Sequence, residues 1–192
     1  QLFEETVEKD VAFGPKNMEL SPEEVDKRVR EAAASMGITD EMLERSPFDL
    51  SGGQKRRVAL AGVIAMEPQI LILDEPAAGL DPIGRDTVLE KISEYHRNSG
   101  TTILLVSHSM EDIVKYADKV LVMNRGRLFC YEDVDKVFSR SKEIQMIGLD
   151  VPQITRLSLM LKEHGVDLGD DVYTIERAKQ RLLEQIKGKR EC

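Results

Sequence analysis

The chain has 192 residues, of which 41% are hydrophobic and 32% are charged, so it can bury the core of one globular domain with an appendage. Its net charge of −8 and pI near 5.1 argue against a nucleic-acid partner, because counterion release needs clustered Lys and Arg. The longest apolar run, Val58 to Met66, is about half of what a membrane-spanning helix needs, so a membrane link would run through a partner protein.

The chain opens with Gln1-Leu2 and no initiator methionine, which predicts that it is the later part of a longer protein. Its two cysteines, Cys130 and Cys192, stand far apart and in no metal-ligand or C-x-x-C spacing. Free thiols in a reducing compartment are therefore expected.

Capping signals predict two helices in the first third of the chain. Ser21-Pro22-Glu23-Glu24 is a capping box with proline at the first helical position, and apolar residues follow at helical spacing as far as Gly37. A second helix is predicted from Gln54 to Met66, directly after the glycine-rich turn Ser51-Gly52-Gly53.

Two short apolar runs, Ile70 to Leu73 and Thr102 to Val106, are typical of buried parallel strands. Pro82 to Arg97 between them has the length of a crossover helix, so a βαβ unit is predicted. Lys119 to Met123 and Leu128 to Tyr131 are predicted to form a hairpin that closes the edge of this sheet.

Beyond about Ser139 the pattern becomes helical only, with helices expected over Pro152 to His164 and Thr174 to Lys187. Leucine and isoleucine side chains form apolar faces on both helices, where they could serve subunit association or pack onto their own domain. These residues are Leu157, Leu161, Leu182 and Ile186.

The turn Ser51-Gly52-Gly53 before a helix allows two interpretations. It can be a plain N-cap, which is the commoner meaning of such a tripeptide. It can also be an anion site, since glycines let the backbone approach a ligand and the first N–H groups of a helix favour phosphate. The Ser51 hydroxyl would add a donor.

Polar side chains also follow both predicted strands. Asp74 and Glu75 come at the carboxyl end of the first strand, where α/β folds bind ligands, and His108 follows the second. Asp74 is suited to hold Mg²⁺, Glu75 to polarise an attacking water, and His108 to contact the γ-phosphate or orient that water. His96 and His164, on helix ends, are expected to be structural.

The ordered run Leu50 to Gln54, Ile70 to Pro76, Gly79-Leu80-Asp81 and then His108 resembles the signature, Walker B, D-loop and switch-histidine segments of ABC ATPases. The opening string as far as Pro15 and the two-helix tail are similar to energy-coupling factor ATPases, which drive bacterial and archaeal vitamin or metal-ion uptake.

The resemblance implies a P-loop NTPase-like α/β fold: a parallel sheet core lacking its N-terminal part, with a helical subdomain and a C-terminal helical appendage. The ATPase fragment would span residues 1–140, with the helical subdomain at about 16–66 and the catalytic core at about 67–140. Residues 141–192 would form the helical extension.

The resemblance also implies an ATPase coupled to transport, with ATP and Mg²⁺ as its ligands. Glu75 and His108 would be catalytic, Asp74 would hold the metal, and the residues that contact nucleotide would be Ser51, Gly52, Gly53, Gln54 and Asp81. In this family the signature closes over ATP bound to the opposite subunit. The implied partners are a second ABC ATPase subunit, identical or different, a transmembrane coupling subunit and, indirectly, a substrate-binding membrane subunit, at the cytoplasmic face of the plasma membrane.

One departure from the family pattern is large: the sequence contains no G-x-x-x-x-G-K-[ST] loop. In the family that loop, with the Q-loop glutamine, lies upstream of where this chain starts, and Gln1 is not expected to be that glutamine. On its own the chain is therefore expected to bind Mg·ATP weakly, to hydrolyse none at a useful rate, and to expose apolar surface beside the first strand.

Two other classes of protein remain as alternatives. The chain could be a non-catalytic binding module that supplies the signature to another subunit. It could also come from a soluble ABC protein of DNA repair or translation, but it has neither the coiled-coil nor the basic insertions of those proteins.

Overall fold

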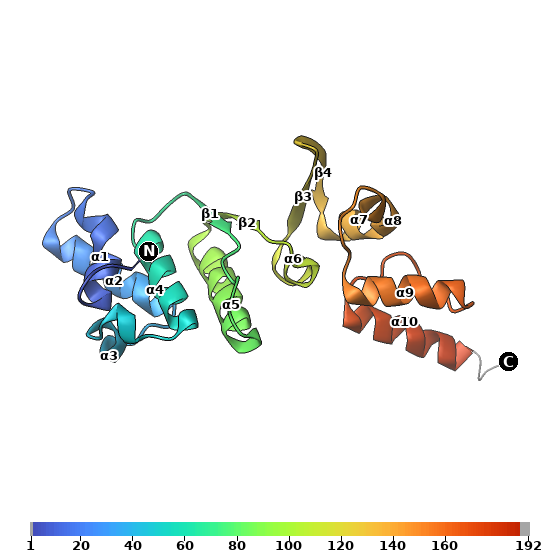
Figure 1. The fold of residues 1–192 in the computed structure, drawn as a ribbon, viewed down its shortest axis with the longest axis horizontal. Coiled ribbons are helices and arrows are strands. Elements are labelled where there is room, and N and C mark those ends of the chain that lie inside the picture. Colours follow the sequence, from blue (N-terminus) through green and yellow to red (C-terminus); the bar gives the residue numbers. More distant parts are fainter. Residues whose placement is uncertain (1, 189–192) are drawn as a thin grey trace. The chain divides into compact units, whose positions relative to one another are not determined.

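The computed structural model describes residues 2–188, which divide into two compact units with a boundary between Val106 and Ser107 (Figure 1). Gln1 and Cys192, and the expectations that concern them, lie outside the described residues. Among residues 2–188 no helix is both long and apolar enough to cross a membrane.

The first unit contains helices followed by a βαβ unit. Its elements are α1 (Val7–Lys16), α2 (Pro22–Ser35), α3 (Asp40–Leu43), the 3₁₀ turn η1 (Pro47–Asp49), α4 (Gly52–Ile64), β1 (Ile70–Asp74), α5 (Pro82–Ser99) and β2 (Thr102–Val106). Helices α1, α2 and α4 pack around a core that includes Val11, Val29 and Val58. The predicted helices after Ser21 and after Ser51 are thus both present.

Helix α1 was not predicted from the sequence. Thr6 caps it, and the buried carboxylate of Asp10 accepts hydrogen bonds from the backbone N–H of Phe3 at 3.1 Å and of Glu4 at 3.3 Å. A Cβ on Gly14 would lie 2.7 Å from the sulfur of Met66, so a larger residue there would require the Met66 side chain to move. Pro15 is fully buried, so both residues that argue against a helix in the sequence are closely packed in the fold.

Strands β1 and β2 pair in parallel, with Ile70 opposite Thr102 and Asp74 opposite Val106, as the predicted βαβ unit requires. The prediction that both strands are buried is wrong for one face of this sheet. Ile70 and Ile72 of β1 are 64% and 65% exposed, and Leu104 and Val106 of β2 are about half exposed. The apolar surface expected beside the first strand is therefore present.

The second unit contains a hairpin and a series of helices. Its elements are α6 (Met110–Tyr116), β3 (Lys119–Asn124), β4 (Arg127–Asp133), α7 (Val134–Ser139), α8 (Ser141–Met146), α9 (Gln153–Glu163) and α10 (Ile175–Gly188). The tight turn uses Arg125 and Gly126, both with positive φ. The hairpin forms a two-stranded sheet within this unit, and its closing of the parallel sheet's edge stays a prediction.

The tail helices divide their apolar residues between the interior and the surface. Leu161 and Leu182 pack against a small core of Leu168, Val172 and Ala178. By contrast, Leu157 and Ile186 are each 49% exposed. Packing onto the same unit thus accounts for the first pair, and association with another subunit remains a possible role only for the second.

Candidate functional site

The turn that opens α4 has the geometry of a capping box. Ser51 Oγ accepts a hydrogen bond from the Gln54 N–H at 3.3 Å, and Gln54 Oε1 accepts one from the Ser51 N–H at 2.8 Å. The N–H groups of Gly52 and Gly53 belong to the first helical turn, where no carbonyl of the helix itself can accept from them. Ser51 and Gly52 are exposed, so this positive end of the helix is open to a ligand.

The two glycines are not needed to fold this turn. Both lie within α4, and neither has a positive φ. A Cβ added to Gly52 would come no closer than 3.7 Å to Leu80, and one added to Gly53 no closer than 3.7 Å to Gly84, which are ordinary contacts. Since glycine in a helix is less stable than alanine, the pair costs stability without an explanation inside the unit.

A second helix start lies against the first. Asp81 is the N-cap of α5, and its Oδ1 accepts a hydrogen bond from the Gly84 N–H at 2.8 Å. The approach of Gly53 to Gly84 brings the first turns of α4 and α5 together. The structure therefore places Ser51, Gly52, Gly53, Gln54 and Asp81 in one region, although they are 30 positions apart at most in sequence.

Asp74 and Glu75 stand at the carboxyl end of β1. Asp74 is the last strand residue and is exposed, whereas Glu75 is partly buried. Glu75 has φ of +47°, which is unusual for a residue with a side chain, and its N–H donates to the carbonyl of Val106 at 3.0 Å. The tight turn from Glu75 to Ala78 is closed by the Ala78 N–H, which donates to the Glu75 carbonyl at 3.1 Å.

His108 is the second residue after β2 and is exposed at the start of the second unit. The other two histidines have local structural partners. His96 Nδ1 lies 2.8 Å from the Thr101 carbonyl, and His164 Nδ1 lies 2.9 Å from the Met160 carbonyl. The expected structural role of these two is thus supported.

The residues present suit a Mg²⁺ ion that is bound mainly by nucleotide. Among residues 2–188 there is no cluster of three or more His, Cys, Asp or Glu side chains that could enclose a metal. Mg²⁺ is commonly held by one or two carboxylates together with phosphate oxygens and water, so the exposed Asp74 carboxylate fits the metal as a single protein ligand.

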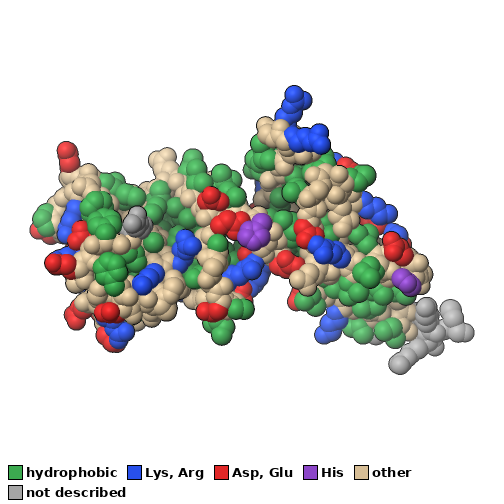
Figure 2. Space-filling view, viewed as in Figure 1, with side chains coloured by type: hydrophobic (Ala, Val, Ile, Leu, Met, Phe, Trp, Pro, Cys, Tyr) green, Lys and Arg blue, Asp and Glu red, His purple; other side chains and the backbone are tan. Residues whose placement is uncertain are grey.

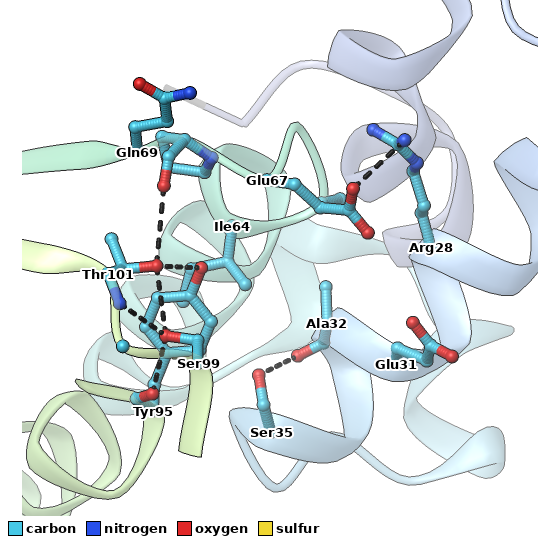
Figure 3. Close-up of a pocket in the computed structure, with 13 residues that line it drawn as sticks. Arg28, Glu31, Ala32, Ser35, Ile64, Glu67, Gln69, Tyr95, Ser99 and Thr101 are labelled. Atoms are coloured by element: carbon cyan, nitrogen blue, oxygen red, sulfur yellow. Dashed lines mark hydrogen bonds and ion pairs between the residues drawn. The ribbon is translucent and has the colours of Figure 1, made fainter. Parts of the chain in front are cut away.

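A pocket of the first unit lies elsewhere (Figure 3). It has a volume of about 540 Å³ and is lined near the amino ends of both strands by Gln69 and Thr101. Several of its polar groups pair with one another: Arg28 pairs with Glu67 at 3.0 Å, and Thr101 Oγ1 contacts the hydroxyl of Tyr95 at 3.2 Å. Because α/β folds bind ligands at the opposite, carboxyl ends of their strands, we place the candidate site at Asp74 and Glu75.

Basic residues of α4 were not singled out in the sequence, although three follow the signature directly. Arg57 donates to the carbonyls of Met36 at 2.9 Å and Gly37 at 2.7 Å, and so holds the end of α2. Arg56 donates to the carbonyl of Ala78 at 3.5 Å. On the face drawn in Figure 2 acidic and basic side chains are interspersed.

Comparison with known proteins shows the family to which the chain belongs. A family model described as ABC transporter matches residues 1–78. The energy-coupling factor transporter ATP-binding protein EcfA2 of Caldanaerobacter subterraneus is 54% identical over 98% of this chain, which spans 66% of that protein. The EcfA2 protein of Clostridioides difficile is 48% identical over 100% of this chain, which spans 67% of it.

Solved structures agree with this relationship. The cbiO1 protein of Clostridium perfringens, described as part of the ABC transporter complex cbiONQ, matches 84% of this chain and 63% of its own, with a TM-score of 0.69 and 38% identity. A dimeric bacterial ABC transporter cassette matches with a TM-score of 0.56 at 24% identity, which supports the fold alone. The fold and the family expected from the motifs are confirmed: the chain belongs to the ABC transporter ATP-binding proteins, and among them to those of energy-coupling factor transporters.

Proposed function

We propose that this chain is part of the ATP-binding and ATP-hydrolysing subunit of an energy-coupling factor importer, which powers uptake of vitamins or metal ions. The names of its relatives support this proposal, and so does the order of its motifs. The observation that carries it is the glycine pair Gly52-Gly53, which has no structural reason within its own unit and stands at an open helix start.

The glycine pair suits a phosphate that approaches from outside the subunit. Its two N–H groups and the Ser51 hydroxyl are donors, and the absence of side chains lets the phosphate come within hydrogen-bond distance of the backbone. We assign this surface, with Gln54 and Asp81, to ATP held by a second ATPase subunit. The site would then be complete only in a dimer, identical or mixed.

The carboxyl end of β1 would carry the chemistry. When bound through Asp74, Mg²⁺ would neutralise phosphate charge. Glu75 would accept a hydrogen bond from the attacking water and draw its proton away, and His108 would donate to a γ-phosphate oxygen or orient that water. These roles follow from the position of the motifs on the strand ends and from the resemblance to the family.

The wider assignments are part of the same proposal. Residues 1–140 would belong to the ATPase domain, with a helical subdomain at about 16–66, and residues 141–192 to a C-terminal extension. A transmembrane coupling subunit would hold the ATPase at the cytoplasmic face of the plasma membrane and pass its movement to a substrate-binding subunit. The net charge of −8 gives no reason to propose a nucleic-acid partner.

The substitution Glu75→Gln in the assembled transporter ATPase tests the proposal. An amide keeps the shape of the side chain but is a far poorer base, so hydrolysis should fall by about 100-fold or more, while dimerisation driven by ATP persists. Phosphate release and light scattering measure the two effects. Glu67→Gln is the matched control, because Glu67 also has a positive φ, of 50°, but lies before β1.

Hydrolysis at a near-normal rate in the Glu75→Gln protein would remove Glu75 from its role. An equal loss in Glu67→Gln would show that the change acts through folding.

A further inference from the structure

Hydrogen bonds connect the start of α4 to the residue that we assign as the base. Arg56, on the second turn of α4, donates to the carbonyl of Ala78 at 3.5 Å. Ala78 in turn donates its N–H to the carbonyl of Glu75 at 3.1 Å. The signature and Glu75, which would serve opposite ATP molecules of a dimer, are thus joined within one subunit.

The conformation of Glu75 makes such a connection useful. Its φ of +47° is unfavourable for a residue with a Cβ and persists only where the surroundings hold it. Pro76, the next residue, is buried and has its φ fixed by its ring, and the Ala78 N–H closes the turn. At the far end of this turn, the Ala78 carbonyl accepts the hydrogen bond from Arg56.

Packing supports the same connection. The Cβ position of Gly52 faces Leu80, and that of Gly53 faces Gly84, each at 3.7 Å. The first turn of α4 therefore lies beside the segment from Ala78 to Gly84, and the Arg56 hydrogen bond joins α4 to that segment. A displacement of this turn by a ligand would act directly on the segment that follows Glu75.

We propose that Arg56 is a positioning residue, which transmits occupancy of the signature turn to the orientation of Glu75 in the same subunit. The inference rests on the proposed function. It assigns to a basic residue of α4 a role in catalysis at the subunit's own ATP, although that residue would contact neither the ATP nor the attacking water.

The test compares three variants in the assembled transporter ATPase. Arg56→Met keeps the apolar stem and removes the donors, so kcat should fall about fivefold with KM for ATP within about twofold of the original. Arg56→Lys keeps one donor and should recover most of the rate. Lys55→Met is the matched control, since Lys55 is its neighbour on α4 but donates to the Phe48 carbonyl, at 3.1 Å.

A second measurement separates positioning from mere support of the fold. In a Glu75→Gln background, Arg56→Met should leave ATP-driven dimerisation unchanged, because Arg56 acts through Glu75. Reduced dimerisation there, an unchanged kcat in Arg56→Met, or an equal loss in Lys55→Met would each overturn the inference. If the original protein releases no phosphate at all, the proposed function fails instead.

Discussion

Replacing Gly53 by alanine should make the protein more stable and less active. Gly53 lies in the first turn of α4 with a helical backbone, so alanine removes conformational freedom from the unfolded chain without strain in the fold. The added methyl group meets nothing closer than the Cα of Gly84 at 3.7 Å. We expect the free energy of unfolding to rise by about 0.5 kcal/mol, which is part of the difference between glycine and alanine in helices.

A gain of that size is measurable. In a unit of about 100 residues, 1 kcal/mol shifts the unfolding midpoint by about 4–8 °C, so Gly53→Ala should raise it by about 2–4 °C. Hydrolysis should fall by at least about tenfold, because the methyl group keeps a phosphate from the N–H groups that would bind it. Thermal unfolding and steady-state phosphate release are the two assays.

Gly62 provides the matched control on the same helix. An added Cβ there lies 3.5 Å from the Asp10 carbonyl and 3.8 Å from the Cα of Val11, which are again ordinary contacts, so Gly62→Ala should also stabilise the fold. Its position far from the signature predicts unchanged hydrolysis. Retained activity in Gly53→Ala, or activity loss accompanied by lower stability, would refute the idea that the glycine is kept for a ligand.

Two further predictions concern caps and the tail. Ser51→Ala and Ser21→Ala each remove an N-cap oxygen that lies 3.3 Å from its N–H donor, so each should destabilise the protein by about 1 kcal/mol. Only Ser51→Ala should slow phosphate release. Equal slowing in both variants would show that Ser51 is a structural cap only. Burial and a hydrogen bond to Asp135 raise the pKa of Tyr173 to about 12, from an ordinary value of 10.0. Its neutral form therefore adds stability that is full below about pH 10 and is lost as pH rises toward 12, by at most about 3 kcal/mol. Tyr173→Phe should abolish this part of the pH dependence of unfolding.

Capping residues and strand ends made much of this fold predictable. Helix α2 begins at Pro22 behind its Ser21 cap, and β2 spans Thr102–Val106 as its apolar run indicated. These signals are local, because a cap or an apolar run acts within a few residues. The candidate site was predictable for the same reason, since its residues stand directly at the ends of such elements.

Features that depend on distant contacts were not predictable. Gly14 and Pro15 argue against a helix locally, but the packing of Gly14 against Met66 favours one. An apolar run such as Ile70 to Leu73 predicts a strand, yet it cannot show which of its faces is covered. The contact of Arg56 with Ala78 joins residues 22 positions apart, so no local sequence pattern predicts it.

The two interpretations of Ser51, as a helix cap and as a phosphate ligand, are compatible in this geometry. In the cap, Ser51 Oγ accepts a hydrogen bond from the Gln54 N–H, which uses one lone pair of the oxygen. The hydroxyl hydrogen is a donor in its own right and can turn toward an acceptor outside the helix. Capping therefore fixes the oxygen where the exposed first turn of α4 would meet a phosphate. Ser21 Oγ accepts the same kind of hydrogen bond, from the Glu24 N–H, and no glycine pair follows it. What distinguishes Ser51 as a phosphate ligand is therefore Gly52-Gly53 and not the serine itself.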